Sequence, residues 1–177
     1  MKKGIILFVM LLTASYFISC EKDDICAEGT PTTPSLVIHF FEDTNRSQPK
    51  NVTNLRVIAE GMETGVPFGT TDVTSASTIQ IPLRTDADQT VYRFIHRATA
   101  TDGTTNEDRI TFNYTRNEIY VSRACGYKTH FNLTSTDPDV AAIYEAGTDG
   151  PWIAADGITI ERTNIEDENE AHINIYF

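Results

Sequence analysis

The sequence predicts an all-β protein, an antiparallel β-sandwich of about eight strands with one short helix. Three observations lead to this fold class. The 177 residues suffice for one domain, and from position 35 onward short runs rich in β-branched and aromatic residues recur between turn signals. Several of these runs alternate apolar and polar side chains with period two. Immunoglobulin-like and transthyretin-like arrangements are both compatible with the pattern, and an open barrel is the alternative architecture.

Eight segments carry the strand pattern. Within them, Ile79 and Ile81 share one face of a strand, and Ile173 and Ile175 do the same. The expected strands are 36–41, 52–59, 78–83, 91–98, 109–114, 119–133, 158–162 and 172–177.

The clearest unit is the stretch RITFNYTRNEIYVSRACGY. A two-residue turn at Arg116-Asn117 would place Tyr114 opposite Ile119, with apolar side chains facing one another across the pair. The same register aims Cys125 inward.

One helix is expected after the hairpin. Asp137 can cap it, Pro138 suits its first turn, positions 140–146 continue it, and Gly147 can end it.

The first nineteen residues have the layout of an export signal. Lys2 and Lys3 precede an apolar run, which is too short to cross a bilayer. The tetrapeptide Phe-Ile-Ser-Cys that ends at Cys20 resembles the lipobox of bacterial lipoproteins, and this resemblance implies a diacylglyceryl group, with its palmitate-like chains, on Cys20. We therefore expect a signal peptide over 1–19, a lipidated N-terminus and tether over 20–34, and the β-sandwich domain over 35–177.

Charge excludes one class of partner. Removal of residues 1–19 leaves 12 basic and 25 acidic side chains, a net charge of −13. An acidic surface repels phosphate backbones, so nucleic-acid binding is not expected.

The chain has three cysteines, Cys20, Cys26 and Cys125. If Cys20 carries lipid, the other two form an even pair in an oxidising compartment, which predicts a Cys26–Cys125 disulfide. A reactive Cys125 thiol near His130 is the alternative, but both fall in one expected strand, five positions apart and on opposite faces. The sequence has neither a C-x-x-C nor an H-x-x-x-H spacing for zinc. Asp86-Ala87-Asp88 and Asp137-Pro138-Asp139 could offer oxygens to Ca²⁺, but neither continues as an EF-hand loop, so neither a metal nor another cofactor is expected.

Known catalytic motifs do not occur in the sequence, and we expect a protein that is not an enzyme. The single tryptophan, Trp152, lies in the glycine-rich stretch GTDGPWIAADG between Asp149 and Asp156. Its ring could stack on a sugar while the two carboxylates accept hydroxyl hydrogen bonds. Packing of Trp152 over the end of the sandwich core is the alternative.

The residues after Cys20 resemble the export signal of Bacteroidota surface lipoproteins, in which a lysine and two acids follow the lipidated cysteine. Lys22, Asp23 and Asp24 match it. The resemblance implies an outer-membrane protein that faces the cell exterior. The stretches VTNLRVIAEG, IPLRTDADQTVYRF, NYTRNEIYVSRACGYKTHFNL and ENEAHINIYF also resemble a family of Bacteroidota lipoproteins of unknown function.

These expectations together describe a lipid-anchored, non-enzymatic binding or assembly module. Its partners would be the membrane, through the lipid, and an outer-membrane protein or a glycan. The alternative function is glycan binding by the Trp152 loop.

Overall fold

The computed structural model describes residues 25–177, which divide into two units. The hairpin unit consists of 25–30 and 120–127, and the sandwich unit of 31–119 and 128–177. Over the described part of the chain, no helix combines the length and apolar character that a membrane crossing requires.

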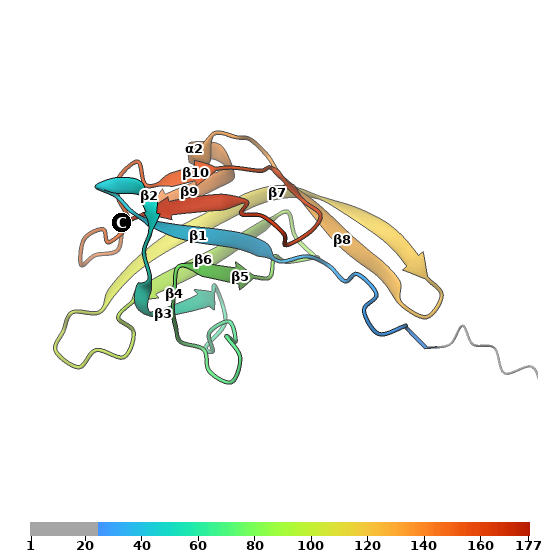
Figure 1. Ribbon diagram of the computed structural model, residues 1–177, viewed down its shortest axis with the longest axis horizontal. Coiled ribbons are helices and arrows are strands. Elements are labelled where there is room, and N and C mark those ends of the chain that lie inside the picture. The colour runs from blue at the N-terminus through green and yellow to red at the C-terminus, as the bar shows by residue number, and fades with distance from the viewer. Residues whose placement is uncertain (1–24) are drawn as a thin grey trace, which may run out of the picture. The chain divides into compact units, whose positions relative to one another are not determined.

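The first sheet has five strands in the order β10-β12-β1-β2, with β5 also beside β1 (Figure 1). Its central strand β1 pairs in parallel with β12, where Ile38 lies opposite Ile173, and antiparallel with β5, where Leu36 lies opposite Ile81. The bounds are β1 Leu36–Glu42, β2 Asn45–Pro49, β5 Thr78–Ile81, β10 Ile158–Ile160 and β12 Ile173–Tyr176.

The second sheet has seven strands in the order β11-β8-β7-β6-β3-β4, with β9 beside β7. Strands β6 and β7 pair over eight residues, from Gln89 opposite Asn113 to His96 opposite Asn106. The bounds are β3 Val52–Ala59, β4 Thr74–Ala76, β6 Gln89–His96, β7 Asn106–Ser122, β8 Gly126–Leu133, β9 Ala142–Glu145 and β11 Asn164–Ile165.

The inward faces of both sheets share one hydrophobic core. On β7 the buried positions alternate through Ile110, Phe112 and Tyr114. The ring of Phe112 lies 6.5 Å from that of Phe94 on β6, centroid to centroid, in an edge-to-face arrangement. Burial of one such aromatic side chain contributes about 1.5–3 kcal/mol to stability. The all-β sandwich expected from the sequence is therefore confirmed.

The turn expected at Arg116-Asn117 is wrong, because β7 continues without a break to Ser122. Arg116 instead forms an ion pair with Asp88, at 2.7 Å between Nε and Oδ1. The chain reverses at 123–125, where Ser122 Oγ accepts a hydrogen bond from the Cys125 amide and Gly126 has a φ of +70°. A short hairpin loop of this kind favours glycine at the position with positive φ. Cys125 consequently lies in the turn and not in a strand.

The helix is shorter than expected and covers only α2, Pro138–Ala141. Asp137 caps it as predicted, because its side chain accepts a hydrogen bond from the Asp139 amide. The following residues form β9 and pair with β7, with Tyr144 opposite Ile110. Pairing with a core strand thus ends the helix at Ala141, although the sequence predicts that it continues to position 146.

Candidate functional site

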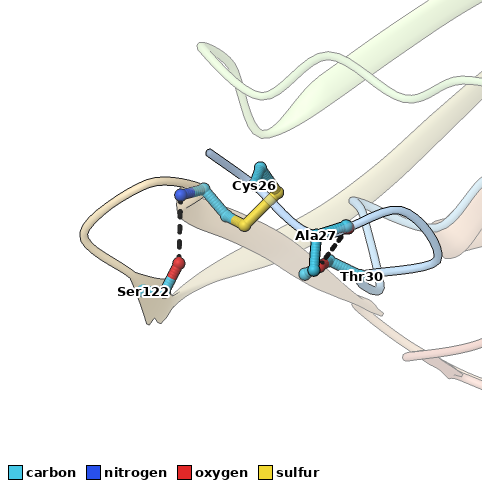
Figure 2. The surroundings of a disulfide bond; sticks show 5 residues. Cys26, Ala27, Thr30 and Ser122 are labelled. Carbon is cyan, nitrogen blue, oxygen red and sulfur yellow. Dashed lines mark hydrogen bonds between the residues drawn. A yellow bond between two sulfur atoms is a disulfide. The ribbon is translucent and has the colours of Figure 1, made fainter. Parts of the chain in front are cut away.

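The hairpin unit contains the disulfide between Cys26 and Cys125, whose Cα atoms are 4.8 Å apart (Figure 2). This confirms the predicted pair. The sulfur of Cys125 is therefore not a free thiol, and the structure contradicts the alternative of a catalytic cysteine beside His130. The bond joins positions 99 residues apart in the sequence.

The N-terminal segment of this unit turns tightly after Cys26. Both the amide and the hydroxyl of Thr30 donate to the Ala27 carbonyl, at 3.1 and 2.6 Å (Figure 2). Ile25 and Tyr120 line a shared hollow of about 550 Å³ next to the disulfide.

The expected signal peptide over 1–19, the lipidation residue Cys20 and the export residues Lys22, Asp23 and Asp24 lie outside the described residues.

In the sandwich unit, the side chain of Asp108 organises the loop that carries the tryptophan. Asp108 is fully buried at the start of β7, in phase with Ile110. Its Oδ1 accepts from the Gly147 amide at 3.1 Å, and its Oδ2 accepts from the amides of Trp152 and Ile153 at 3.0 Å each. The Tyr144 hydroxyl also donates to Oδ2, at 3.0 Å.

These four donors satisfy both carboxylate oxygens, which is the condition for burying a charge. Burial, and then the hydrogen bond to Asp108, raise the pKa of Tyr144, so its hydroxyl remains a donor. Gly147 is required here because a Cβ at this position would lie 1.9 Å from the Glu107 carbonyl oxygen. Asp108 thus holds the loop against β7.

Trp152 lies against the core. Its Nε1 donates to the Phe94 carbonyl at 3.1 Å, and its ring centroid is 5.3 Å from that of His96 and 5.5 Å from that of Phe177. Burial lowers the pKa of His96, which favours the neutral form of this ring. The indole N–H and much of the ring are therefore engaged within the protein.

The two aspartates expected beside Trp152 have separate surroundings. Asp149 accepts a hydrogen bond from the Glu107 amide at 3.3 Å and lines a hollow of about 470 Å³ together with Asp108. Asp156 lines a different, smaller hollow next to α2. Trp152 lines neither of them. The structure does not bring the three predicted residues into one site, and glycan binding remains a prediction.

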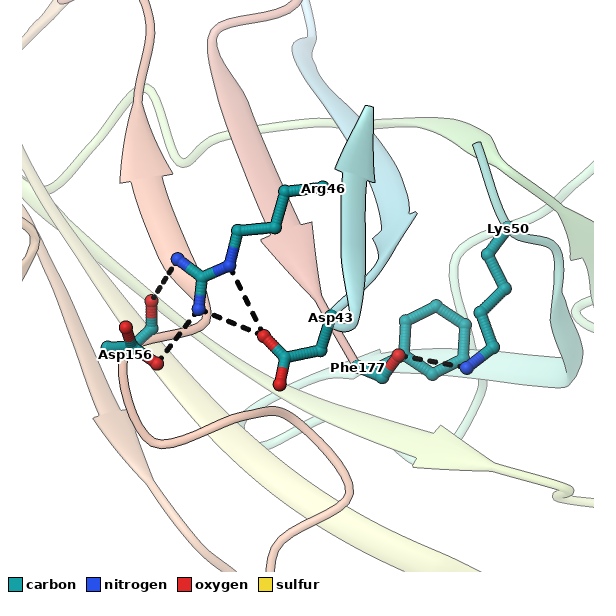
Figure 3. Close-up of polar contacts among 5 residues, drawn as sticks. All are labelled: Asp43, Arg46, Lys50, Asp156 and Phe177. Carbon is teal, nitrogen blue, oxygen red and sulfur yellow. Dashed lines mark hydrogen bonds and ion pairs between the residues drawn. The ribbon is translucent and has the colours of Figure 1, made fainter. Parts of the chain in front are cut away.

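Asp156 instead joins an ion-pair cluster on the surface of the first sheet (Figure 3). The Arg46 guanidinium is 2.9 Å from both Asp43 and Asp156 and stacks over the Tyr176 ring, 4.6 Å from its centroid. Lys50 donates to the Phe177 backbone oxygen at 2.9 Å (Figure 3). Hydrogen bonds to Asp43 and Asp156 raise the pKa of Arg46. The cluster fastens the exposed strand β2 to the rest of its sheet.

A buried histidine, His172, connects β1 with the segment before β12. Its Nδ1 accepts a hydrogen bond from the Val37 amide at 3.0 Å, and its own amide donates to the Val37 carbonyl at 3.0 Å. Burial and the nearby Arg162 lower the pKa of His172 to about 4. The neutral ring is therefore part of the pairing of β1.

Sequence patterns did not single out Asp108 or the structural role of His172. The available signal for Asp108 was its spacing of two residues from Ile110, which gives a strand position that faces the core.

Within residues 25–177 no group of three or more histidine, cysteine or acidic side chains is arranged to hold a metal ion.

The model of a family of unknown function, DUF6452, matches residues 54–177, which is more than half of the chain. No curated protein and no solved structure matches.

Proposed function

We propose that this chain, which belongs to the family of unknown function DUF6452, is a lipid-anchored outer-membrane protein that faces the cell exterior and acts as a non-enzymatic binding or assembly module. The observation that carries this proposal is the Cys26–Cys125 disulfide. It uses two of the three cysteines, and the third, Cys20, directly follows the export signal. A disulfide also suits the oxidising compartment to which such a signal leads.

The position of the disulfide limits the length of the linker between Cys20 and the hairpin unit. Six residues from Cys20 to Cys26 span at most about 20 Å, because an extended chain covers about 3.3–3.6 Å per residue. Two acyl chains on Cys20 would give stable membrane attachment. The hairpin unit thus stays close to the lipid surface, which supports a partner in or at the membrane.

Substitution of the anchor residue tests the attachment. We expect Cys20→Ser to move the protein from the membrane fraction to the soluble fraction, since the acyl chains have no other attachment point in the proposal. The double variant Cys26→Ser/Cys125→Ser is the control, because it keeps Cys20 and is expected to remain membrane-bound. Recovery of the Cys20→Ser protein in outer membranes would overturn the proposal.

The side of the membrane is tested separately, by protease treatment of intact cells. We expect the wild-type protein to be cleaved and a triple Lys22→Ala/Asp23→Ala/Asp24→Ala variant to be protected, because these residues match the surface-export signal. Full protection of the wild-type protein would contradict exposure to the exterior. Chemical crosslinking in intact cells, followed by purification from solubilised outer membranes, would then identify the partner.

A further inference from the structure

We propose that exposed side chains of the hairpin unit form a second, non-covalent contact with the membrane, in its headgroup layer. This inference rests on the proposed function, because it takes Cys20 as acylated. The occupant of the surface is the lipid bilayer that holds the acyl chains of the same molecule.

Large apolar side chains gather on this unit. The exposed fractions are 84% for Ile25, 58% for Tyr120 and 67% for Tyr127. Within residues 25–177 six large hydrophobic side chains are exposed, and half of them lie in the fourteen described residues of the hairpin unit. The two tyrosine rings pack edge to face with centroids 5.4 Å apart, and Tyr120 shares its hollow with Ile25. Tyr120 therefore connects Ile25 with Tyr127, and we call these three side chains the apolar patch.

The chemistry of these side chains suits a membrane interface. Tyrosine combines an apolar ring with a polar hydroxyl, so it is stable where acyl chains meet headgroups and water. Ile25 adds a purely apolar side chain, and its transfer out of water into the interface is favourable. The rings of Tyr120 and Tyr127 would lie among headgroups with their hydroxyls hydrated.

The described residues of the hairpin unit differ in net charge from the chain as a whole. Its described residues contain one acid, Glu28, and one base, Arg123, whereas the chain after residue 19 has a net charge of −13. Anionic lipids give a membrane surface a negative potential, which repels acidic protein surfaces. The fourteen described residues of the hairpin unit carry no net charge, so they add nothing to this repulsion.

Covalent geometry keeps the patch within reach of the bilayer. Ile25 lies five residues after Cys20, at most about 18 Å away along an extended chain. The disulfide links the neighbouring Cys26 to Cys125, in the turn between the two tyrosines. Because the patch is held near the lipid, even a weak interfacial affinity suffices to keep it there.

A photo-crosslinker at position 127 tests the contact. Benzoylphenylalanine replaces Tyr127 in the full-length, lipidated protein, which is reconstituted into vesicles of phosphatidylethanolamine and phosphatidylglycerol. The matched control carries the same residue in place of Met62, which is 57% exposed in the sandwich unit. After irradiation, we expect a yield of lipid adducts about tenfold higher at position 127, since only that position would lie in the interface.

Each other result has a distinct meaning. Equal adduct yields at the two positions would overturn the contact, and so would crosslinking of position 127 to a protein and not to lipid in whole cells. The mass of the peptide that contains Cys20, measured on the same samples, separates the two proposals. An acylated peptide without lipid adducts at position 127 contradicts this inference alone, whereas a peptide without acyl groups contradicts the lipid anchor as well.

Discussion

A single buried carboxylate determines how the loop with the only tryptophan is held. Asp108 accepts four hydrogen bonds, three of them from backbone amides of the segment 147–153. These amides do not pair with a neighbouring strand, so the side chain of Asp108 supplies the hydrogen-bond acceptors that they need.

We predict that Asp108→Asn lowers the free energy of unfolding by about 2–4 kcal/mol, because the amide group of asparagine places a donor against donors. Urea denaturation measures the change. The matched control is Asp149→Asn, an exposed aspartate of the same loop with one hydrogen bond to the Glu107 amide, for which we expect less than about 0.5 kcal/mol. Equal effects of the two substitutions would contradict the role assigned to Asp108.

The sequence predicted some side chains of the candidate site and missed others for physical reasons. The Cys26–Cys125 pair followed from counting cysteines. If Cys20 is lipidated, only two cysteines remain, and two cysteines in an oxidising compartment are expected to pair. Asp108 was missed because an acid before a strand is usually solvated, and only its phase relative to Ile110 indicates burial.

At the scale of elements, strands were predictable where one face is buried. Strand β3 has the expected bounds because its buried residues repeat along Val52–Ala59. Strand β2 was missed because all five of its residues are exposed, so no apolar pattern marks it. In β7 the exposed polar residues at 115–118 suggested a turn, although the backbone there stays extended.

The hairpin of β7 and β8 is the element that the disulfide ties to the N-terminal segment. We predict that Cys26→Ser/Cys125→Ser lowers the free energy of unfolding by about 2–4 kcal/mol, because the bond restricts a loop of about 100 residues in the unfolded chain. Urea denaturation of the Cys20→Ser background, with and without the two further substitutions, provides the measurement.

A change below about 0.5 kcal/mol would show that the closed loop contributes little to the unfolded-state entropy. Thiol titration of the unfolded background protein is the control. It should detect no free thiol before reduction and two after it, since Cys26 and Cys125 are then the only cysteines.

At the scale of the whole molecule, the first sheet is assembled through contacts between β1 and the segment that leads into β12. His172 takes part as a neutral ring, with Nδ1 as the acceptor for the Val37 amide. Protonation of the ring would place a proton on Nδ1 and remove this hydrogen bond. Stability of the fold is therefore linked to pH through this residue.

We predict that acid weakens the wild-type protein more than a His172→Asn variant, whose side-chain oxygen can still accept from Val37. The folded-state pKa of about 4 lies below the usual value of 6.5, so the unfolded state binds the proton first as the pH falls. The contribution of His172 is complete above pH 6.5 and decreases between pH 6.5 and 4. The total loss is on the order of 3 kcal/mol.

Urea denaturation of both proteins at pH 7, 5.5 and 4.5 measures this difference. The carboxylates and the other histidines, His39, His96 and His130, are present in both proteins, so their contributions largely cancel. Parallel pH profiles would contradict the linkage to His172.

The parallel pairing of β1 with β12 also has a consequence for the order of folding. Ile38 and Ile173 are neighbours in the sheet, although 135 residues separate them along the chain. Contacts between such distant positions form slowly, because the intervening chain must first be brought together. Under the proposed export, a chain that crosses the membrane from its N-terminus could not complete this sheet until residues 173–176 had emerged, so the topology would delay the pairing of β1 with β12 until then.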